Sequence, residues 1–384
     1  MNVLVLIPYL YDTAPGQRFR IEQWARGLEE RGVRFQFIPF ETSALKEILH
    51  RRGCHLRKII ELLRGIYRRS RVLAAIDQRW DVILLYREML PLGPPIFERL
   101  LAKKGIPIVY DFDDAIFLPE VSEANQRFLW LKWPQKIGTI CRLSAYAIVG
   151  NGYLKDYALQ FTPRVSVIPT TIDTDTYTLK PSAEIRETPV IGWSGSMTTL
   201  KHLRVIEPTL RALRCTTPYR LKVVGQRGVE MDGLDVESKD WDRKTEVADL
   251  QSFDIGMMPL PDDAWARGKC GLKLLQYMAV GVPTVASPVG VNVEIIQDGI
   301  NGFLASTEQE WVAKLQLLIS DRALRERLAK AGRETIEQKY AAKLHAPHLL
   351  EVLRAVQHRP AAEALTGESN DQPDGVTAAE YRVA

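Results

Sequence analysis

Three cations stand where a predicted helix begins. Apolar residues at helical spacing predict a helix from Leu272 to Val280, and Lys269, Lys273 and Arg267 lie around its start. Unpaired backbone N–H groups and the positive end of the dipole make a helix N-terminus favourable for an anion. The sequence therefore predicts a site for a negatively charged ligand, and the alternative is that the lysines are only solvated.

A second group of polar side chains is acidic. Asp113 and Asp114 follow the apolar run from Ile106 to Tyr110, which predicts a parallel strand buried on both faces. Parallel sheets bind ligands outside the carboxyl ends of their strands, so both carboxylates are candidate site residues. The alternative is that Asp113 or Asp114 caps a helix.

The third charged feature is a basic stretch. The segment from Lys46 to Arg79 carries ten basic and three acidic residues, a net charge of +7. Apolar residues at helical spacing in it predict a basic amphipathic helix, which is typical of docking on an anionic membrane surface. A solvated face on a packed helix gives the same pattern, whereas nucleic acid binding is not expected without a recognition motif. The apolar residues are Leu56, Ile59, Ile60, Leu63, Ile66 and Tyr67.

The chain as a whole has the composition of a globular protein with two domains. Of its 384 residues, 46% are hydrophobic and 26% charged, and the net charge is +4. No apolar run approaches the roughly 20 residues of a membrane-spanning helix, and Met1 to Leu10 lacks the features of a signal peptide. The four cysteines show no metal-binding spacing and are expected to be reduced cytosolic thiols.

Strands and helices alternate along the chain, which predicts doubly wound parallel sheets. The alternation pauses in a polar stretch and restarts at Val190. We therefore expect an N-terminal domain at 1–170, a linker at 171–189 and a C-terminal domain at 190–345. A helix at 346–358 is expected next, with a return to the first domain as one option, and then a disordered tail at 359–384.

The residues around the lysines carry a family resemblance. Gly268 to Ser287 reads GKCGLKLLQYMAVGVPTVAS, and Pro288 to Leu304 continues PVGVNVEIIQDGINGFL. Both segments resemble the signature of the retaining glycosyltransferases of family 4, also called group 1. The order and spacing match from about residue 190 to 340 and more weakly over 1–173, where IPTTID at 168–173 is similar to the interdomain segment of that family.

The resemblance implies an α/β protein of the GT-B fold, with two Rossmann-like doubly wound parallel-sheet domains facing each other across a cleft. A nucleotide-sugar donor would bind the C-terminal domain and an acceptor the N-terminal one. The sugar would pass to an acceptor hydroxyl with retention of configuration, and no metal or other cofactor is expected. Asp111-Phe112-Asp113 matches a metal-binding Asp-X-Asp motif by letter, but it lies outside the donor domain.

The family's donor-site positions are only partly kept. Gly195 and Lys201 match a glycine and a lysine near the donor phosphates, whereas Ser196 stands where the family has an arginine. Without a metal, cations and backbone amides must meet the negative charge of the leaving diphosphate. Lys269 and Lys273 are the candidates to replace the missing arginine.

Further donor positions also differ from the family. Gly290 and Val291 stand where the family has two glycines that approach the phosphates, and a valine restricts the backbone. The family's two glutamates, separated by seven residues, align with Gly268 and Gln276, and a glutamine can still hydrogen-bond the ribose hydroxyls. Glu294 aligns with an acidic position near the donor, with a surface or capping acid as the alternative.

In the N-terminal domain, Gly16 and Arg18 lie in a loop that resembles the one facing the donor phosphates. Arg18 is a candidate phosphate clamp, with a surface arginine at a helix start as the alternative. Asp113 and Asp114 are candidates to orient the acceptor hydroxyl or to stabilise an oxocarbenium ion. Many family members have a histidine in this region, but the histidines here lie elsewhere, at His50, His55, His202, His345, His348 and His358.

These features predict an enzyme that transfers a sugar from a nucleotide sugar to an acceptor hydroxyl in glycan or polysaccharide assembly. The expected partners are the nucleotide sugar, a glycan or lipid-linked acceptor and an anionic membrane surface. The expected location is the cytoplasm, or peripherally the inner face of the membrane. The alternatives are a degenerate protein that binds sugar nucleotides, suggested by Ser196, Gly268 and Gln276, and a sugar-nucleotide epimerase of the same fold.

Overall fold

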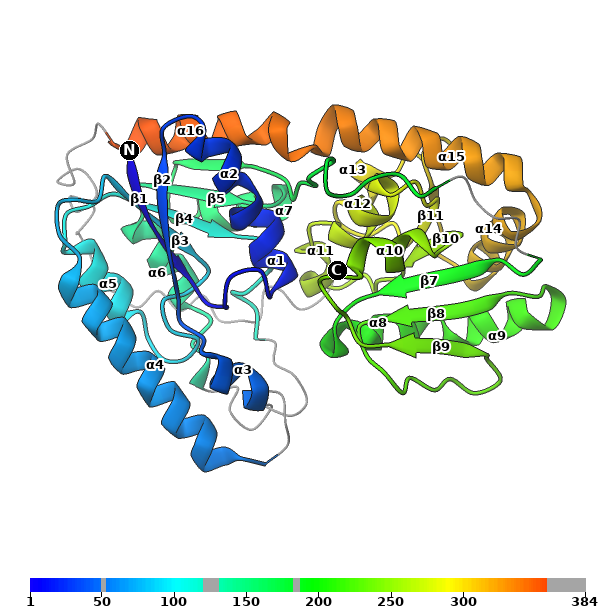
Figure 1. Cartoon of the computed structure of the whole chain (residues 1–384), viewed down its shortest axis with the longest axis horizontal. Coiled ribbons are helices and arrows are strands. Elements are labelled where there is room, and N and C mark those ends of the chain that lie inside the picture. The colour runs from blue at the N-terminus through cyan, green and yellow to red at the C-terminus, as the bar shows by residue number, and fades with distance from the viewer. Residues whose placement is uncertain (50–52, 120–130, 182–186, 358–384) are drawn as a thin grey trace. The chain divides into compact units, whose positions relative to one another are not determined.

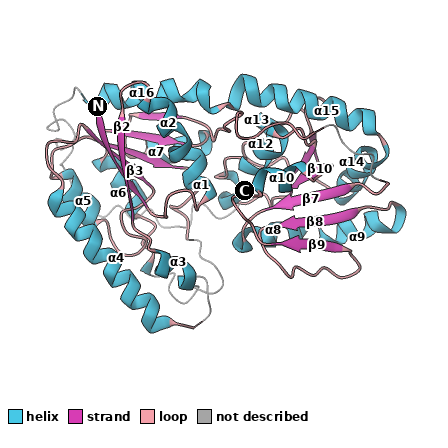
Figure 2. Cartoon of the chain, viewed as in Figure 1, coloured by secondary structure: helices cyan, strands magenta, loops and turns pink. Residues whose placement is uncertain are grey.

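The computed structural model describes residues 1–49, 53–119, 131–181 and 187–357 (Figure 1). They form two compact units, one of Met1–Ile168 with Pro347 onward and one of Pro169–Ala346. Each unit has its own six-stranded sheet with helices around it (Figure 2). The tail at 359–384 lies outside the described residues. Within the described ranges, no helix is long and apolar enough to cross a bilayer.

The sheet of the first unit has the order β2-β1-β3-β4-β5-β6, and all neighbouring strands are parallel. Every residue of β3 is buried, as expected for a parallel strand covered on both faces. The order reverses between β1 and β3, so this is the topological switch point of the unit. The strands are β1 (Asn2–Ile7), β2 (Arg34–Pro39), β3 (Val82–Tyr86), β4 (Ile108–Phe112), β5 (Tyr146–Val149) and β6 (Val165–Val167).

The helical segment that follows β1 is interrupted by a π-helical turn. A π-helical turn, Arg18–Glu22, joins α1 (Pro15–Gln17) to α2 (Gln23–Glu29), and all five residues of the turn are buried. Such turns are frequent at functional sites. The other helices of this unit are α3 (Ser43–Leu49), α4 (His55–Ala75), α5 (Ile96–Ala102), α6 (Lys136–Leu143) and α7 (Gly152–Leu159).

The sheet of the second unit has the order β12-β11-β10-β7-β8-β9 and is also parallel throughout. Counted within the unit, this is the 3-2-1-4-5-6 order of the Rossmann fold, with its switch point between β7 and β10. The strands are β7 (Val190–Ser194), β8 (Arg220–Val224), β9 (Val236–Lys239), β10 (Ile255–Met258), β11 (Thr284–Ala286) and β12 (Phe303–Leu304).

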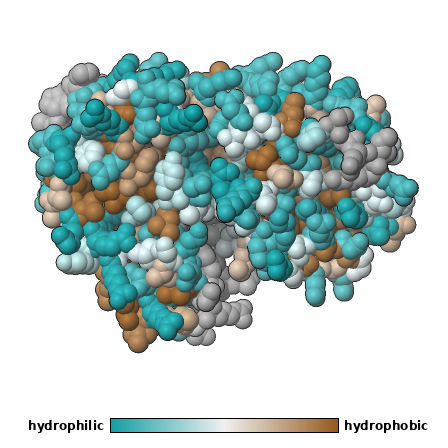
Figure 3. All heavy atoms as spheres, in the orientation of Figure 1, coloured by the Kyte–Doolittle hydropathy of each residue, from teal (hydrophilic) through white to brown (hydrophobic). Residues whose placement is uncertain are grey.

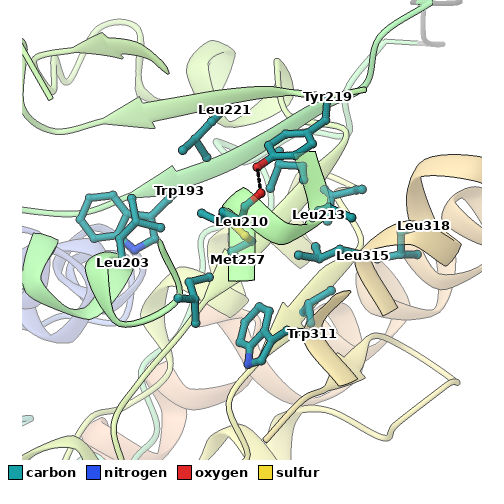
Figure 4. Close-up of a cluster of buried hydrophobic side chains, with 14 of the residues drawn as sticks. Trp193, Leu203, Leu210, Leu213, Tyr219, Leu221, Met257, Trp311, Leu315 and Leu318 are labelled. Atoms are coloured by element: carbon teal, nitrogen blue, oxygen red, sulfur yellow. Dashed lines mark hydrogen bonds between the residues drawn. The ribbon is translucent and has the colours of Figure 1, made fainter. Parts of the chain in front are cut away.

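One face of this second sheet is covered by a large apolar core. Figure 4 shows Trp193 and Met257 of the sheet meeting Leu203, Leu210 and side chains of α14, among them Trp311. Trp193 is only 1% exposed and packs in this core. The helices here are α8 (Leu200–Val205), α9 (Glu207–Thr216), α10 (Glu246–Gln251), α11 (Ala264–Arg267), α12 (Leu272–Ala279), α13 (Asn292–Ile295), α14 (Glu308–Ser320) and α15 (Arg322–Thr335). Two short elements complete the unit, the 3-10 turn Met197–Thr199 and the π-helical turn Ile336–Tyr340.

The opposite face of the second sheet receives α12. Gly256 and Gly192 leave room there, because a Cβ at Gly256 would come within 2.5 Å of the Tyr277 ring and one at Gly192 within 2.0 Å of the Phe253 ring. The last helix, α16 (Ala342–Gln357), begins in the second unit and passes into the first at Pro347.

The expected doubly wound parallel sheets are confirmed, with differences at individual elements. The strand expected at residues 106–110 is β4, Ile108–Phe112, because Asp111 is buried against Arg20 and stays in the sheet. The edge strands β9 and β12 were not predicted. They are short, and β9 (VESK) has no apolar alternation.

Candidate functional site

The candidate residues of the second unit gather at its switch point. β7 leads through Gly195 toward Lys201, and the connection after the neighbouring strand β10 carries Lys269 and Lys273. The carboxyl ends of adjacent strands whose connections run in opposite directions leave a crevice in which such sheets bind ligands. The lysines therefore stand where a ligand of this unit is expected.

All three lysines affect the pKa of His202. His202 is 3% exposed, and its pKa is lowered to about 4, first by burial and then by the positive charges of Lys269, Lys273 and Lys201. A nearby cation disfavours the protonated imidazole. The three lysine charges make this part of the unit electropositive, which favours the binding of an anion such as a diphosphate.

The packing of α12 fixes the position of Lys273. Tyr277 lies one turn later, and its hydroxyl accepts the backbone N–H of Ser194 at 2.8 Å. Residues four apart lie on the same face of a helix, so Lys273 also faces β7. Its Nζ lies 4.9 Å from the centre of the Trp193 ring, a cation–π contact near the end of that strand.

Lys269 is placed differently from the prediction. Both lysines were expected at the start of the helix, but α12 starts after Gly271, and Lys269 lies in the turn that follows α11. Its Nζ is 5.6 Å from the centre of the half-buried Trp265 ring. Gly271 takes a φ of +69°, a left-handed conformation that glycine adopts without strain, so the turn separates the two lysines.

Glycines at this edge of the sheet bring backbones together. Gly225 ends β8 with a φ of +135°, and a Cβ there would lie 1.6 Å from the carbonyl oxygen of Gly195. Gly290 has a φ of +54° and approaches the main chain of Arg267, since its Cβ would lie 2.9 Å from the Arg267 carbonyl oxygen. These positions require glycine, and they place the loop after β11 against the turn that carries Lys269.

Three other candidates of this unit lie near this edge or on its surface. Ser196 is exposed, and its hydroxyl lies 2.9 Å from that of Thr198. Val291 is half-buried, with a methyl group 3.3 Å from where a Cβ of Gly271 would be. Glu294 is exposed on α13, where it helps to raise the pKa of Tyr340 after the larger effect of burial.

Gln276 meets a carboxylate that the sequence did not reveal. Its Nε2 donates to Glu246 Oε1 at 3.1 Å and lies 3.4 Å from the hydroxyl of Tyr177. Gln276 is 6% exposed and Glu246 is 4% exposed. Gln276 stands where the family has a glutamate. Its neighbour is a buried glutamate, Glu246, which belongs to α10.

In the first unit, the candidate carboxylates surround an arginine at the switch point between β1 and β3. Arg87 follows β3, and its Nη2 lies 2.8 Å from Asp113 Oδ1 and 2.5 Å from Asp114 Oδ2. Tyr86 donates its hydroxyl to Asp113 Oδ1 at 2.7 Å. Gly16 lies in α1, which follows β1, and a Cβ there would lie 2.8 Å from both Asp113 Oδ2 and the Tyr86 hydroxyl.

This cluster is electrostatically tuned. Burial alone would raise the pKa of Asp113, but the charges of Arg87 and Arg20 and the hydrogen bonds from Arg87 and Tyr86 lower it below its usual value. Asp113 is therefore a stable carboxylate. Arg87 has a φ of +59°, an uncommon conformation for a residue with a side chain, and such residues cluster at functional sites.

The remaining charged residues here form ion pairs, one of which is fully buried. Arg20 binds Asp111 through Nη2 at 2.6 Å, and both side chains are inaccessible to solvent. Asp111 is the first aspartate of the Asp-X-Asp match, and its carboxylate is thus already bound by Arg20. Arg18, the expected clamp, is 6% exposed, and its Nε lies 3.0 Å from Asp12 Oδ1. Among the described residues, no three His, Cys, Asp or Glu side chains group as metal ligands.

Comparisons with known proteins agree with this geometry. Residues 264–335, which include α11, α12, Lys269 and Lys273, match the family model described as "Glycosyl transferases group 1". A sucrose synthase from Thermosynechococcus vestitus is 36% identical over 90 residues, which cover 22% of this chain and 11% of that protein. The chain thus spans about a tenth of the length of the curated relatives that it matches.

Solved structures match over most of the chain. A glycosyltransferase from Rickettsia africae has a TM-score of 0.65 at 14% identity, covering 93% of this chain and 99% of its own. Anabaena HepE, whose structure was solved with UDP and glucose, has a TM-score of 0.63 at 16% identity, covering 92% and 100%. The chain therefore has the GT-B fold. The resemblance to the group 1 glycosyltransferases is confirmed, on the family model at residues 264–335 and on this fold.

Two residues of these clusters, Arg87 and Glu246, were not predicted from the sequence. Arg87 follows a strand as Asp113 does, so the rule that ligands bind at strand ends would have selected it. Glu246 lies near no family motif, and its contact with Gln276 spans thirty residues of sequence. Only the fold brings that pair together.

Proposed function

We propose that this protein is a glycosyltransferase that moves a sugar from a nucleoside diphosphate sugar to an acceptor hydroxyl. The observation that carries the proposal is that Lys201, Lys269 and Lys273 follow β7 and β10 at the switch point of the second sheet, where their charges also lower the pKa of His202. The group 1 family model covers the segment that supplies two of these lysines, which supports the same function.

In the proposed reaction, the bond between the anomeric carbon and the β-phosphate oxygen breaks as the acceptor oxygen bonds to that carbon. The nucleoside diphosphate leaves with the electron pair, and the acceptor proton passes to the leaving phosphate oxygen. The developing negative charge lies beside the lysine ammonium groups, which stabilise it without a metal ion. Departure and attack on the same face of the sugar would retain its configuration.

The lysines replace a cation that the family has and this chain lacks. Ser196 supplies no charge, and its hydroxyl is near Thr198. Lys269 and Lys273 come from the opposite side of the switch point, after β10. We assign to Lys273 the role of meeting the diphosphate, because Tyr277 and Trp193 fix its position.

In the first unit, we assign the acceptor side of the reaction to Asp113 and Asp114. Asp113 remains ionised because its pKa is lowered, so it can accept a hydrogen bond from an acceptor hydroxyl or stabilise a positively charged sugar ring. Arg87 is a positioning residue, since it binds both carboxylates. The acceptor that we propose is a glycan, free or lipid-linked. We propose that the protein binds it in the cytoplasm, at the inner face of the membrane.

The test begins with a thermal-shift screen of UDP-, GDP-, ADP- and TDP-sugars. A donor at 100 times its dissociation constant adds about 2.7 kcal/mol to the free energy of unfolding, enough to raise the melting temperature measurably. One nucleotide should stand out, and its sugar should then be transferred to an extracted glycan or glycolipid, with release of the nucleoside diphosphate. Binding without release would indicate a degenerate protein, and the absence of any shift at millimolar donor would refute the proposal.

A further inference from the structure

Helix α4 of the first unit presents its apolar residues to solvent. Leu56, Ile59, Leu63 and Tyr67 are 71%, 53%, 59% and 64% exposed, and Ile60 is 38% exposed. At about 100° per residue, all five fall within one narrow stripe of the helix surface. Isolated exposed apolar residues are ordinary, but a continuous stripe along three turns indicates an interaction surface.

The buried face of the same helix carries two charged side chains. The buried residues are Glu61, Gly65, Arg69 and Leu73, spaced by four, and they lie on the side opposite the apolar stripe. The usual arrangement of a surface helix, apolar inside and polar outside, is thus reversed over these turns.

Specific contacts fix this orientation. Arg69 donates from Nη2 to the carbonyl of Ile7 at 2.9 Å and from Nη1 to that of Ile38 at 3.2 Å, at the carboxyl ends of β1 and β2. Gly65 lies against Phe40, since a Cβ there would be 2.8 Å from the ring. Glu61 accepts the Thr42 hydroxyl at 3.2 Å. The helix cannot rotate to bury its apolar stripe without losing these contacts.

Positive charge accompanies the stripe. Arg57, Arg64, Arg68 and Arg71 are exposed and follow one long edge of the stripe. Glu61 is the only acidic residue within α4, and it is buried and paired with Arg64. In Figure 3, hydrophobic atoms reach the surface beside hydrophilic ones at the lower left, where Figure 1 shows the beginning of α4. Arg51 and Arg52, also part of the basic stretch, lie outside the described residues.

We propose that α4 is a docking surface for an anionic lipid bilayer, with the helix lying in the plane of the interface. Leu56, Ile59, Leu63 and Tyr67 would enter the boundary between headgroups and acyl chains, and the arginines would bind the lipid phosphates. An apolar stripe edged by basic residues is the pattern of an interfacial helix. The inference goes beyond glycosyl transfer and does not depend on it.

The charges argue against the other occupants of such a surface. A second copy docked on the same face would bring two sets of exposed arginines together, since a two-fold interface pairs like surfaces. A nucleic acid would use the arginines but would leave the apolar stripe in water. An anionic bilayer satisfies both features, and each basic residue near its surface contributes about 1 kcal/mol.

The test is co-sedimentation of the full chain with vesicles of phosphatidylcholine alone and of phosphatidylcholine with 30% phosphatidylglycerol. We expect binding to the anionic vesicles at least tenfold tighter than to the neutral ones, and weaker in 0.5 M NaCl. The variant Leu56→Gln/Leu63→Gln should lose at least tenfold in partition, and so should Arg57→Glu/Arg71→Glu. The matched control Val205→Gln/Leu317→Gln removes two exposed apolar side chains of the second unit and should bind as the wild type does.

Each variant is checked by circular dichroism and by its melting temperature, so that loss of binding is not confused with loss of fold. Equal binding to neutral and anionic vesicles would overturn the proposal, and so would stripe variants that bind normally. Sedimentation velocity on the same proteins tests whether the surface instead binds a second copy of the chain. A dimer that the Leu56→Gln/Leu63→Gln variant abolishes, together with no vesicle binding, would assign the surface to a second copy of the chain.

Discussion

Arg87 Nη2 lies 2.8 Å from Asp113 Oδ1, and this contact joins the ends of two neighbouring strands, β3 and β4. The arginine side chain is 16% exposed and the aspartate 9%. The same Nη2 binds Asp114, so one guanidinium holds two carboxylates in place. A buried network of this kind must be complete, because removal of one member leaves the others charged and unpaired.

The first prediction concerns that network. Arg87→Met should lower the free energy of unfolding by roughly 3–5 kcal/mol, because it leaves the buried carboxylate of Asp113 and the half-buried one of Asp114 without their cation. Equilibrium unfolding in urea measures the change. The control is Arg79→Met, which removes an exposed ion pair with Asp77 at 3.4 Å and should cost less than about 1 kcal/mol. Equal losses in the two variants would show that the Arg87 network contributes no more than a surface ion pair.

The second prediction concerns the lysines. Lys273→Ala and Lys269→Ala should each weaken binding of the nucleotide-sugar donor at least tenfold, because each removes a cation near the diphosphate. The melting temperature without donor should change little, since neither variant creates a cavity in the apolar core. Lys330→Ala, an exposed lysine of α15, is the control. If the site variants bound donor as tightly as Lys330→Ala does, the proposed phosphate site would be wrong.

The third prediction is a pH dependence set by His202. Its folded pKa is about 4, below the ordinary 6.5, so the unfolded chain takes up the proton first as the pH falls. The free energy of unfolding should therefore drop between pH 6.5 and pH 4, by about 2 kcal/mol on reaching pH 5. The variant His202→Gln, measured by urea unfolding at pH 7.5, 6 and 5, should lack this part of the pH dependence. Parallel curves for the two proteins would contradict it.

The same histidine reports on the ligand. A bound diphosphate would offset the positive charges of Lys201, Lys269 and Lys273, and this should raise the pKa of His202. Proton NMR of the imidazole with and without UDP measures this change, and the His202→Gln variant assigns the resonance. A pKa that does not move when UDP is bound would place the nucleotide away from the lysines.

The sequence predicted the fold well because apolar residues recur in it with the periods of strands and helices. Apolar strands such as Val82 to Tyr86, separated by amphipathic helices, indicate a parallel sheet, and the segment around Lys273 added the family resemblance. The placement of the three lysines was also predictable, since Lys201, Lys269 and Lys273 all follow strands of one parallel sheet.

What the sequence could not supply are side-chain contacts between distant elements. The reversed orientation of α4 depends on carbonyls of Ile7 and Ile38, which no helical pattern of that segment contains. Its apolar residues alone left open whether the stripe is exposed or buried, since a packed helix with a solvated face gives the same pattern. The partner of Gln276 likewise comes from a helix, α10, whose place is set by the fold of the whole unit.

The last prediction follows from that partner. Gln276→Glu restores the residue type found in the family, yet it should destabilise this protein by roughly 2–4 kcal/mol. Its carboxylate would replace an amide that now donates to Glu246 Oε1 at 3.1 Å, so two buried like charges would face each other. The swapped variant Glu246→Gln/Gln276→Glu keeps one carboxylate and one amide in contact, and it should recover most of the loss. Urea unfolding of the two single variants and the swap completes a double-mutant cycle, whose coupling energy isolates the pair. If the donor binds the swapped protein as tightly as the wild type, either position can present the carboxylate to the ribose hydroxyls. If binding is lost although stability recovers fully, the ligand requires Glu246 itself.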